Sequence, residues 1–132
     1  MQSAETDSRM AEALDKVADV DIDEGTFKYV LIKVYHSPPA PAQETSKYIV
    51  RGYMTAEYHS DVYDRVMPNI ERLGLACECV GGGRINHQAA EGNIKVYGYS
   101  QGFGKADHSV AVTLLKKKYP DYKSVTFSND GY

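Results

Sequence analysis

The chain has 132 residues, of which 42% are hydrophobic and 25% charged, the size and composition of one globular domain. Its net charge of −3 argues against a surface built for nucleic acid, and no apolar run is long enough to span a membrane. The N-terminus lacks the basic-then-apolar order of a signal peptide. We therefore expect a cytoplasmic protein with neither nucleic acid nor a membrane as a partner.

Residues 1–18 are mostly polar, with one set of apolar residues spaced as on one face of a helix. Those positions are Met10, Ala13, Leu14 and Val17. A helix this short is only marginally stable alone. We expect 1–18 to be a flexible tail and 19–132 to be the folded domain. The acidic segment 19–25 lacks the glycine position and the closing glutamate of an EF-hand loop, so it predicts no calcium site.

Residues 26–36 give the strongest strand signal, because β-branched and aromatic side chains dominate the run TFKYVLIKVYH. Both faces of this strand are largely apolar, which predicts a central strand covered on both sides. Lys28 lies at the entry of one buried face. A lysine at a strand end commonly extends to water, but Lys28 is also placed to direct a cation into a pocket.

A proline-rich connection follows at 37–46 and predicts a loop. Residues 47–53, with the sequence KYIVRGY, are expected to form a second strand. Gly52 within it indicates a bulge or a close approach of another backbone segment. Arg51 shares a face with Ile49.

His59 stands directly before two good helix-capping residues, Ser60 and Asp61. If either residue is the N-cap, His59 lies just outside the helix at its positive end. Free backbone N–H groups and the helix dipole favour an anion there. A titratable imidazole beside an anion site suits phosphoryl or acyl chemistry, although a lone histidine before a helix is more often a plain surface residue.

The helix itself is predicted from about Ser60 to Leu73, ending before Gly74. Its apolar stripe consists of Val62, Val66, Ile70 and Leu73. Pro68 inside this span is expected to kink the helix or to leave its second half irregular.

A third strand is predicted at 75–82, where Cys77 and Cys79 point to the same face. Cysteines two residues apart are unsuited to a disulfide of normal geometry, so we expect reduced core thiols and no metal site. Three glycines then open the segment 81–88, which resumes strand alternation. With the strand at 93–100 it should form a hairpin.

The last elements are a glycine-containing loop at 99–108, a helix at about 107–119 and a short strand at 124–128. Three lysines at the end of this helix complement its dipole, so they do not indicate a nucleic-acid site. These elements predict an α/β or α+β fold: a single central mixed sheet of five to six strands, packed by two main helices.

Residues 98–102 match the G-x-S-x-G pattern of a hydrolase nucleophile elbow around Ser100. Asp107 and His108 follow, but both lie on the helix that this same loop opens. A catalytic triad takes its acid and base from separate loops, so the hydrolase reading is disfavoured.

The loop at 99–104 can instead cradle a phosphate, because small residues let backbone N–H groups approach an oxyanion. An ordinary strand–helix turn that uses glycines for positive φ explains the same residues equally well. Arg51 and Arg84 can clamp oxyanions with two hydrogen bonds each, or can be solvated strand charges.

Several motifs, in order along the chain from about Asp19 to Tyr132, resemble the Janus/Ocnus family. They are FKYVLIKV, YIVRGY, AEYHSDVYD, CECVGGGRINHQ, VYGYSQGFG, KYPDY and NDGY. The resemblance implies a phosphatase that removes phosphate from histidine, and to some extent lysine, in proteins and peptides, without a metal or other cofactor.

The resemblance also implies roles for single residues. The family's catalytic histidine falls on His59. The expected substrate contacts are Lys28, Arg51, Tyr58, Ser60, Arg84, Ser100, Gln101 and Gly102. Gln101 and Gly102 differ from the Met-Ala pair of mammalian members. A contact through backbone N–H groups survives such changes.

Two roles stay open for His59: attack on phosphorus, or removal of a proton from attacking water. The alternative to an enzyme is a phosphate- or phosphopeptide-binding module without turnover. The expected partners are histidine-phosphorylated proteins or peptides. We expect a monomer, because no long apolar stripe is left without an intramolecular use.

Overall fold

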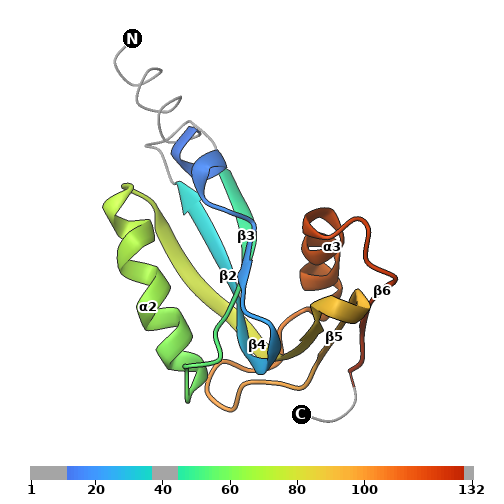
Figure 1. Ribbon diagram of the computed structural model, residues 1–132. Coiled ribbons are helices and arrows are strands. Elements are labelled where there is room, and N and C mark those ends of the chain that lie inside the picture. Colours follow the sequence, from blue (N-terminus) through green and yellow to red (C-terminus); the bar gives the residue numbers. More distant parts are fainter. Residues whose placement is uncertain (1–11, 37–44, 130–132) are drawn as a thin grey trace.

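The computed structural model describes residues 12–36 and 45–129, which form a six-stranded mixed sheet with a helix on each face (Figure 1). The strands are β1 (Val20–Ile22), β2 (Gly25–His36), β3 (Thr45–Gly52), β4 (Ala76–Gln88), β5 (Asn93–Tyr97) and β6 (Ser124–Phe127). Their order across the sheet is β1-β3-β2-β4-β5-β6. The outer pairs β1–β3 and β5–β6 are parallel, and the three inner pairs are antiparallel.

The two main helices are α2 (His59–Arg72) and α3 (His108–Lys118). A single 3-10 turn, η1 (Ala89–Glu91), closes the β4–β5 hairpin, and residues 12–16 are also helical. The predicted fold class, the sheet of five to six strands and the two main helices are confirmed. Among the described residues, no helix has the length and apolar character needed to cross a lipid bilayer.

The core has two halves because successive side chains of β2 point to opposite faces of the sheet. Phe27, Tyr29 and Leu31 pack with residues of α3 on one face. Val30 and Ile32 pack with α2 on the other. The α2 residues in this second cluster are Val62, Val66 and Ile70. β2 is therefore the central, doubly covered strand that its sequence predicted.

The folded core begins earlier than the expected boundary at Asp19. Leu14 and Val17 are buried in the core cluster on the α2 side; Leu14 lies in the short helix at 12–16 and Val17 directly follows it. The rest of the predicted tail, 1–11, lies outside the described residues. So does most of the predicted proline-rich loop, since β3 already begins at Thr45.

β1 was not predicted. It has three residues in an acidic segment; it pairs in parallel with β3, and Val20 and Ile22 pack on the core of the α3 side. The separate strands predicted at 75–82 and 81–88 are one continuous strand, β4. Val80 is an extra residue in it, because Ile32 pairs with Cys79 while Leu31 pairs with Gly81. This β-bulge bends the strand without ending it.

Pro68 does not divide α2, which is assigned as one helix from His59 to Arg72. Cys77 and Cys79 are free and half-buried against the α2 side of the core, as the sequence predicted. Burial raises the pKa of both thiols. Both cysteines are therefore packing residues with little thiolate character.

Candidate active site

The site lies where β2 pairs with β4, next to the N-terminus of α2. Lys28 of β2 lies directly opposite Arg84 of β4. Both positions alternate with core residues of the α3 side, so both side chains lie on the α2 face of the sheet. The first residue of α2 is His59, which brings a histidine to the same place as the two cations.

The predicted N-cap, Ser60 or Asp61, was wrong by two or three residues, although the helix begins only one residue before the predicted start at about Ser60. Tyr58 is the N-cap, and His59 is the first helical residue rather than a residue outside the helix. The reason is that Asp61 stabilises the start from inside the first turn: its Oδ2 accepts a hydrogen bond of 2.8 Å from the Tyr58 N–H. This arrangement leaves the N–H groups of His59 and Ser60 without a partner among the described residues.

The glycines of β4 let three segments meet at this point. A Cβ on Gly82 would lie 2.7 Å from the Tyr29 carbonyl oxygen, 2.8 Å from Cδ2 of His59 and 3.1 Å from Cβ of Ser100. At Gly81, where φ is +144°, a Cβ would lie 2.6 Å from the backbone of Ala106. Only glycine permits the helix start and the loop after β5 to approach the strand so closely.

The loop after β5 is held as a closed turn. The backbone groups of Ser100 and Gly104 exchange two hydrogen bonds, and Ser100 Oγ accepts a third from the Phe103 N–H at 3.1 Å. The buried hydroxyl of Ser100 is thus used inside the loop. The N–H groups of Gln101 and Gly102, at the tip, make no hydrogen bond within the described part of the chain.

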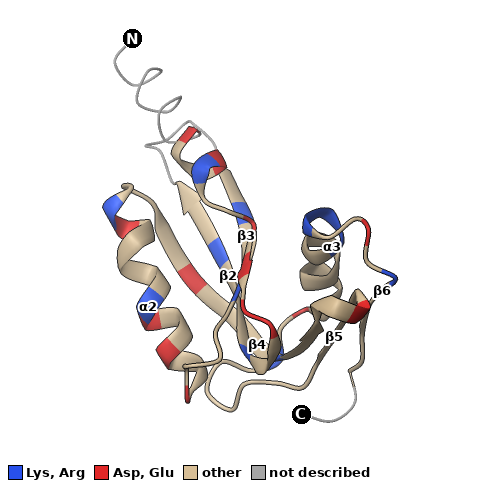
Figure 2. Ribbon diagram, in the orientation of Figure 1, with Lys and Arg blue, Asp and Glu red and all other residues tan. Residues whose placement is uncertain are grey.

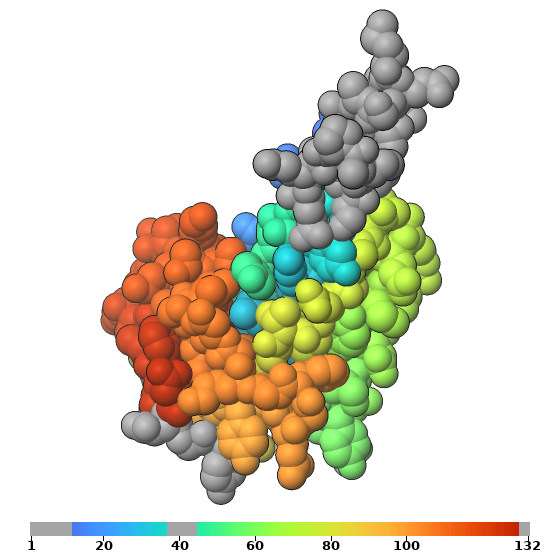
Figure 3. All heavy atoms as spheres, turned by 180° about the vertical axis from the view of Figure 1, so that it is seen from behind, coloured from blue at the N-terminus to red at the C-terminus, as the bar shows by residue number. Residues whose placement is uncertain are grey.

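These pieces surround a cavity of about 600 Å³. Its lining residues are Lys28, Glu57, Tyr58, His59, Ser60, Arg84, Tyr99, Ser100, Gln101, Gly102 and Phe103. Figure 3 shows the segment after β5, in orange, beside the start of α2, in green, at the lower part of that face. Among the described residues, no group of three or more His, Cys, Asp and Glu side chains could hold a metal ion.

The imidazole of His59 is fixed on one side and open on the other. Its Nε2 lies 2.8 Å from the carbonyl oxygen of Gly83. Because a carbonyl oxygen only accepts, Nε2 carries the hydrogen and the lone pair of the neutral ring is on Nδ1. Burial lowers the pKa of His59; the hydrogen bond to Gly83 opposes this effect, and the charges of Lys28 and Arg84 add to it.

Comparison with known proteins identifies the family. The family model described as the Janus/Ocnus family matches residues 14–123. The chain belongs to the Janus/Ocnus family. It is 54% identical to a 14 kDa phosphohistidine phosphatase of Sus scrofa over 127 residues, which cover 93% of this chain and all of that protein.

Two further relatives in the Janus/Ocnus family show a similar extent of likeness. The 14 kDa phosphohistidine phosphatase of Homo sapiens is 55% identical over 119 residues, 88% of this chain and 94% of that protein. The sex-regulated protein janus-A of Drosophila melanogaster is 46% identical over 122 residues, 92% of this chain and 86% of that protein. The family resemblance inferred from the motifs is therefore confirmed.

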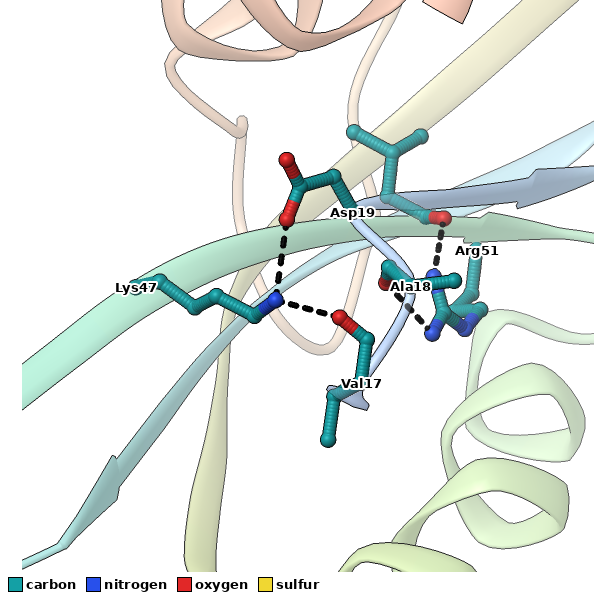
Figure 4. Close-up of polar contacts among 6 residues, drawn as sticks. Val17, Ala18, Asp19, Lys47 and Arg51 are labelled. Atoms are coloured by element: carbon teal, nitrogen blue, oxygen red, sulfur yellow. Dashed lines mark hydrogen bonds and ion pairs between the residues drawn. The ribbon is translucent and has the colours of Figure 1, made fainter. Parts of the chain in front are cut away.

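The structure brings together all but one of the residues expected from the family resemblance. The exception is Arg51, which lines a separate hollow with residues from the middle and end of α2. Its guanidinium is buried and donates to the carbonyl oxygens of Val50 and Ala18, at 3.0 and 2.8 Å (Figure 4). Figure 4 also shows Lys47 beside it, bonded to Asp19 and to the Val17 carbonyl. Arg51 thus ties Ala18 to β3 and lies outside the cavity that the other expected substrate contacts line.

The geometry also excludes the hydrolase triad that the G-x-S-x-G pattern suggested. His108 is buried on the α3 side, where its Nε2 donates to the Gly98 carbonyl oxygen at 2.8 Å. Its Nδ1 accepts a hydrogen bond of 2.5 Å from the Tyr29 hydroxyl. Asp107 caps α3 by accepting from the Ser109 N–H. Neither residue is available to activate Ser100.

Sequence reasoning missed Glu57 as a lining residue. It included Tyr99 and Phe103 only as members of the loop at 99–104, and it gave no role to the glycines of β4. The run of three glycines was the available signal. Three successive residues without side chains in a strand indicate a close backbone approach, which here is the approach of His59 and of the loop after β5.

Proposed function

We propose that this chain is a phosphohistidine phosphatase that hydrolyses the P–N bond of phosphohistidine in proteins and peptides. Two relatives with that name match it at 54% and 55% identity over most of their length. The observation that supports the chemistry best is the fixed tautomer of His59: Nε2 is bonded to Gly83 and Nδ1 is left open, in a cavity that Lys28 and Arg84 also line.

The phosphoryl group would bind between cations and backbone N–H groups. Lys28 and Arg84 supply two positive charges from opposite positions of β2 and β4. The first N–H groups of α2 and the N–H groups at the tip of the loop, Gln101 and Gly102, supply donors for the phosphoryl oxygens. This set can neutralise the charge of a phosphoryl group, so we propose that no metal is needed.

His59 would then act through Nδ1. As a nucleophile, Nδ1 forms a bond to phosphorus while the P–N bond of the substrate breaks. The electron pair of that bond goes to the departing imidazole nitrogen, which takes up a proton. Water then hydrolyses the phosphorylated His59 to release phosphate. As a general base, Nδ1 instead takes a proton from water as the water attacks phosphorus and the P–N bond breaks, and the protonated ring can give that proton to the departing imidazole nitrogen. Both roles need a neutral ring, which the lowered pKa provides near neutral pH.

The partners implied are histidine-phosphorylated proteins or peptides. We further propose that the protein is cytoplasmic, which the free thiols of Cys77 and Cys79 support, since reduced cysteines are usual in that compartment. We also propose that the protein is a monomer. Analytical ultracentrifugation would test this by measuring its molecular mass in solution.

The experiment that tests the proposed function follows phosphate release from a phosphohistidine peptide in the presence of a metal chelator. Wild type should release phosphate, and His59→Ala should be slower by at least about 100-fold, the usual contribution of a positioned acid–base or nucleophilic group. Arg51→Lys, outside the cavity, is the matched control and should keep most of the rate. Phosphate binding without release by well-folded wild type would instead favour the binding-module alternative.

The two roles of His59 are separated by trapping. Rapid denaturation during turnover of a ³²P-labelled substrate should leave label on wild type if Nδ1 attacks phosphorus. An unlabelled enzyme under conditions of fast turnover would support the general-base role.

A further inference from the structure

The α2 face of the sheet has an open half beyond the active site. The positions concerned are Lys28, Arg84, Asn86, Lys95, Tyr97 and Thr126, here called the open sheet face. The pairing register places them in a continuous array: Lys28 opposite Arg84, Arg84 opposite Tyr97, Asn86 opposite Lys95, and Lys95 opposite Thr126.

The burial of the neighbouring residues in sequence shows on which side of the sheet the open sheet face lies. Ile85, Val96 and Val125 are buried in the core on the α3 side. Because side chains alternate along a strand, the positions next to them lie on the opposite side, the side of α2.

α2 does not cover the open sheet face. The buried residues of α2 belong to the core cluster that contains Val30, Ile32 and Val34 of β2, which lie further along the strand than Lys28. Lys95 and Thr126 are exposed, and the other four positions are half-buried. The open sheet face is thus a polar sheet surface that begins inside the candidate active site and extends to the last strand.

The charge of the open sheet face is opposite to that of the chain as a whole. It carries three cations, Lys28, Arg84 and Lys95, and no carboxylate, whereas the chain has a net charge of −3. Acidic residues lie along α2 and β1 instead (Figure 2). Within the described residues none of the three cations is in an ion pair, and the contact found for Lys95 is with the ring of Tyr97 at 6.0 Å. Glu57 is the carboxylate at the rim of the adjoining cavity.

The dimensions suit a peptide. From Lys28 on β2 to Thr126 on β6 the face crosses three strand spacings, about 14 Å, which is the length of about four residues of extended chain. We propose that the open sheet face binds an acidic stretch of the substrate protein directly beside its phosphohistidine. This inference rests on the proposed function and names the class of substrate that the enzyme prefers.

The first test compares three phosphohistidine peptides whose flanking residues are acidic, neutral or basic. The acidic peptide should have the lowest KM on wild type, and its advantage should shrink as ionic strength rises, because exposed charges are screened by salt. Equal KM values for the acidic and neutral peptides, or a preference for the basic peptide, would overturn the inference.

The second test reverses the charge of Lys95, which lies on the open sheet face but does not line the cavity. Lys95→Glu should raise the KM of the acidic peptide by about two- to fivefold, the range expected from one exposed charge pair, and leave kcat and the neutral peptide unchanged. The matched control is Lys116→Glu, an exposed lysine at the end of α3. Thermal unfolding establishes that both variants are folded. Equal effects of the two substitutions on the acidic peptide would contradict the inference.

A binding measurement separates this inference from the proposed function. Fluorescence anisotropy of an unphosphorylated, labelled acidic peptide needs no turnover, and its affinity should fall in Lys95→Glu but not in Lys116→Glu. Suppose that wild type releases no phosphate from any peptide, but Lys95→Glu still binds the acidic peptide more weakly than Lys116→Glu. The proposed function would then be wrong, and the peptide-binding role of the open sheet face would be supported. If phosphate is released without any preference for a flanking sequence, the proposed function is supported and the peptide-binding role of the open sheet face is wrong.

Discussion

His59 and His108 are held alike on one side of the ring and differently on the other. Each donates from Nε2 to a glycine carbonyl oxygen at 2.8 Å, and burial lowers the pKa of each. Nδ1 of His108 is closed off by the hydroxyl of Tyr29, whereas Nδ1 of His59 has no partner among the described residues and belongs to a side chain that lines the cavity. The same side chain is thus part of the core in one place and available for chemistry in the other.

The largest expected effect concerns stability. His108→Ala should lower the free energy of unfolding by about 2–4 kcal/mol, because it leaves the buried Tyr29 hydroxyl and Gly98 carbonyl without partners and opens a cavity. His59→Ala should change it by about 1 kcal/mol or less, since the half-buried ring borders the open cavity. Urea unfolding of both variants measures the difference. Equal losses of stability would remove the contrast between the two histidines.

The next effect concerns the space around His59. In Gly82→Ala the new Cβ would meet the Tyr29 carbonyl oxygen and the His59 ring, so the ring or the strand must move. Phosphate release should fall by about 10- to 100-fold, as expected for a small misplacement of a catalytic group. Gly102→Ala is the control: its Cβ meets nothing within 4 Å, and its rate should stay within about twofold. A normal rate in Gly82→Ala would show that the close approach is unnecessary.

The smallest effect is a change in titration. The positive charge of Lys28 contributes to the lowered pKa of His59, so Lys28→Met should move that pKa upward, toward the ordinary value. As the pH is lowered, the His59 ring of the variant would therefore become protonated at a higher pH than the ring of wild type. NMR titration of the His59 ring protons measures this directly, with Lys116→Met as the control. An unchanged or lower pKa in Lys28→Met would refute the electrostatic account.

Local pattern was sufficient for most of the fold. The apolar alternation of 26–36 reflects its burial on both faces, and the spacing of Val62, Val66 and Ile70 reflects the packing of α2. In both cases the side chains that form the core also set the periodicity of the sequence. β1 could not be found in this way, because three residues are too few for their apolar–polar–apolar order to stand out in an acidic segment.

The candidate site was only partly accessible from local pattern. His59 and the loop around Ser100 were visible as separate motifs, but pairing across strands is what unites Lys28 and Arg84. The environment of Arg51 depends on the carbonyl of Ala18, which lies 33 residues away in sequence, so no local pattern predicts it. The N-cap of α2 was misplaced because Ser60 and Asp61 were taken as the candidate caps, whereas Tyr58 is the N-cap and Asp61 supports it from the third helical position.

The extra residue at Val80 determines which face of the sheet each later side chain of β4 points to. Before it, odd-numbered residues such as Cys77 and Cys79 face α2; after it, even-numbered residues such as Arg84 do so. If Val80 were an ordinary strand residue rather than a bulge, Arg84 would be directed into the apolar core and Ile85 into the cavity. Loss of one residue from 81–83 should therefore turn Arg84 toward the core, whereas loss of Val80 would remove the bulge and keep Arg84 on the α2 face.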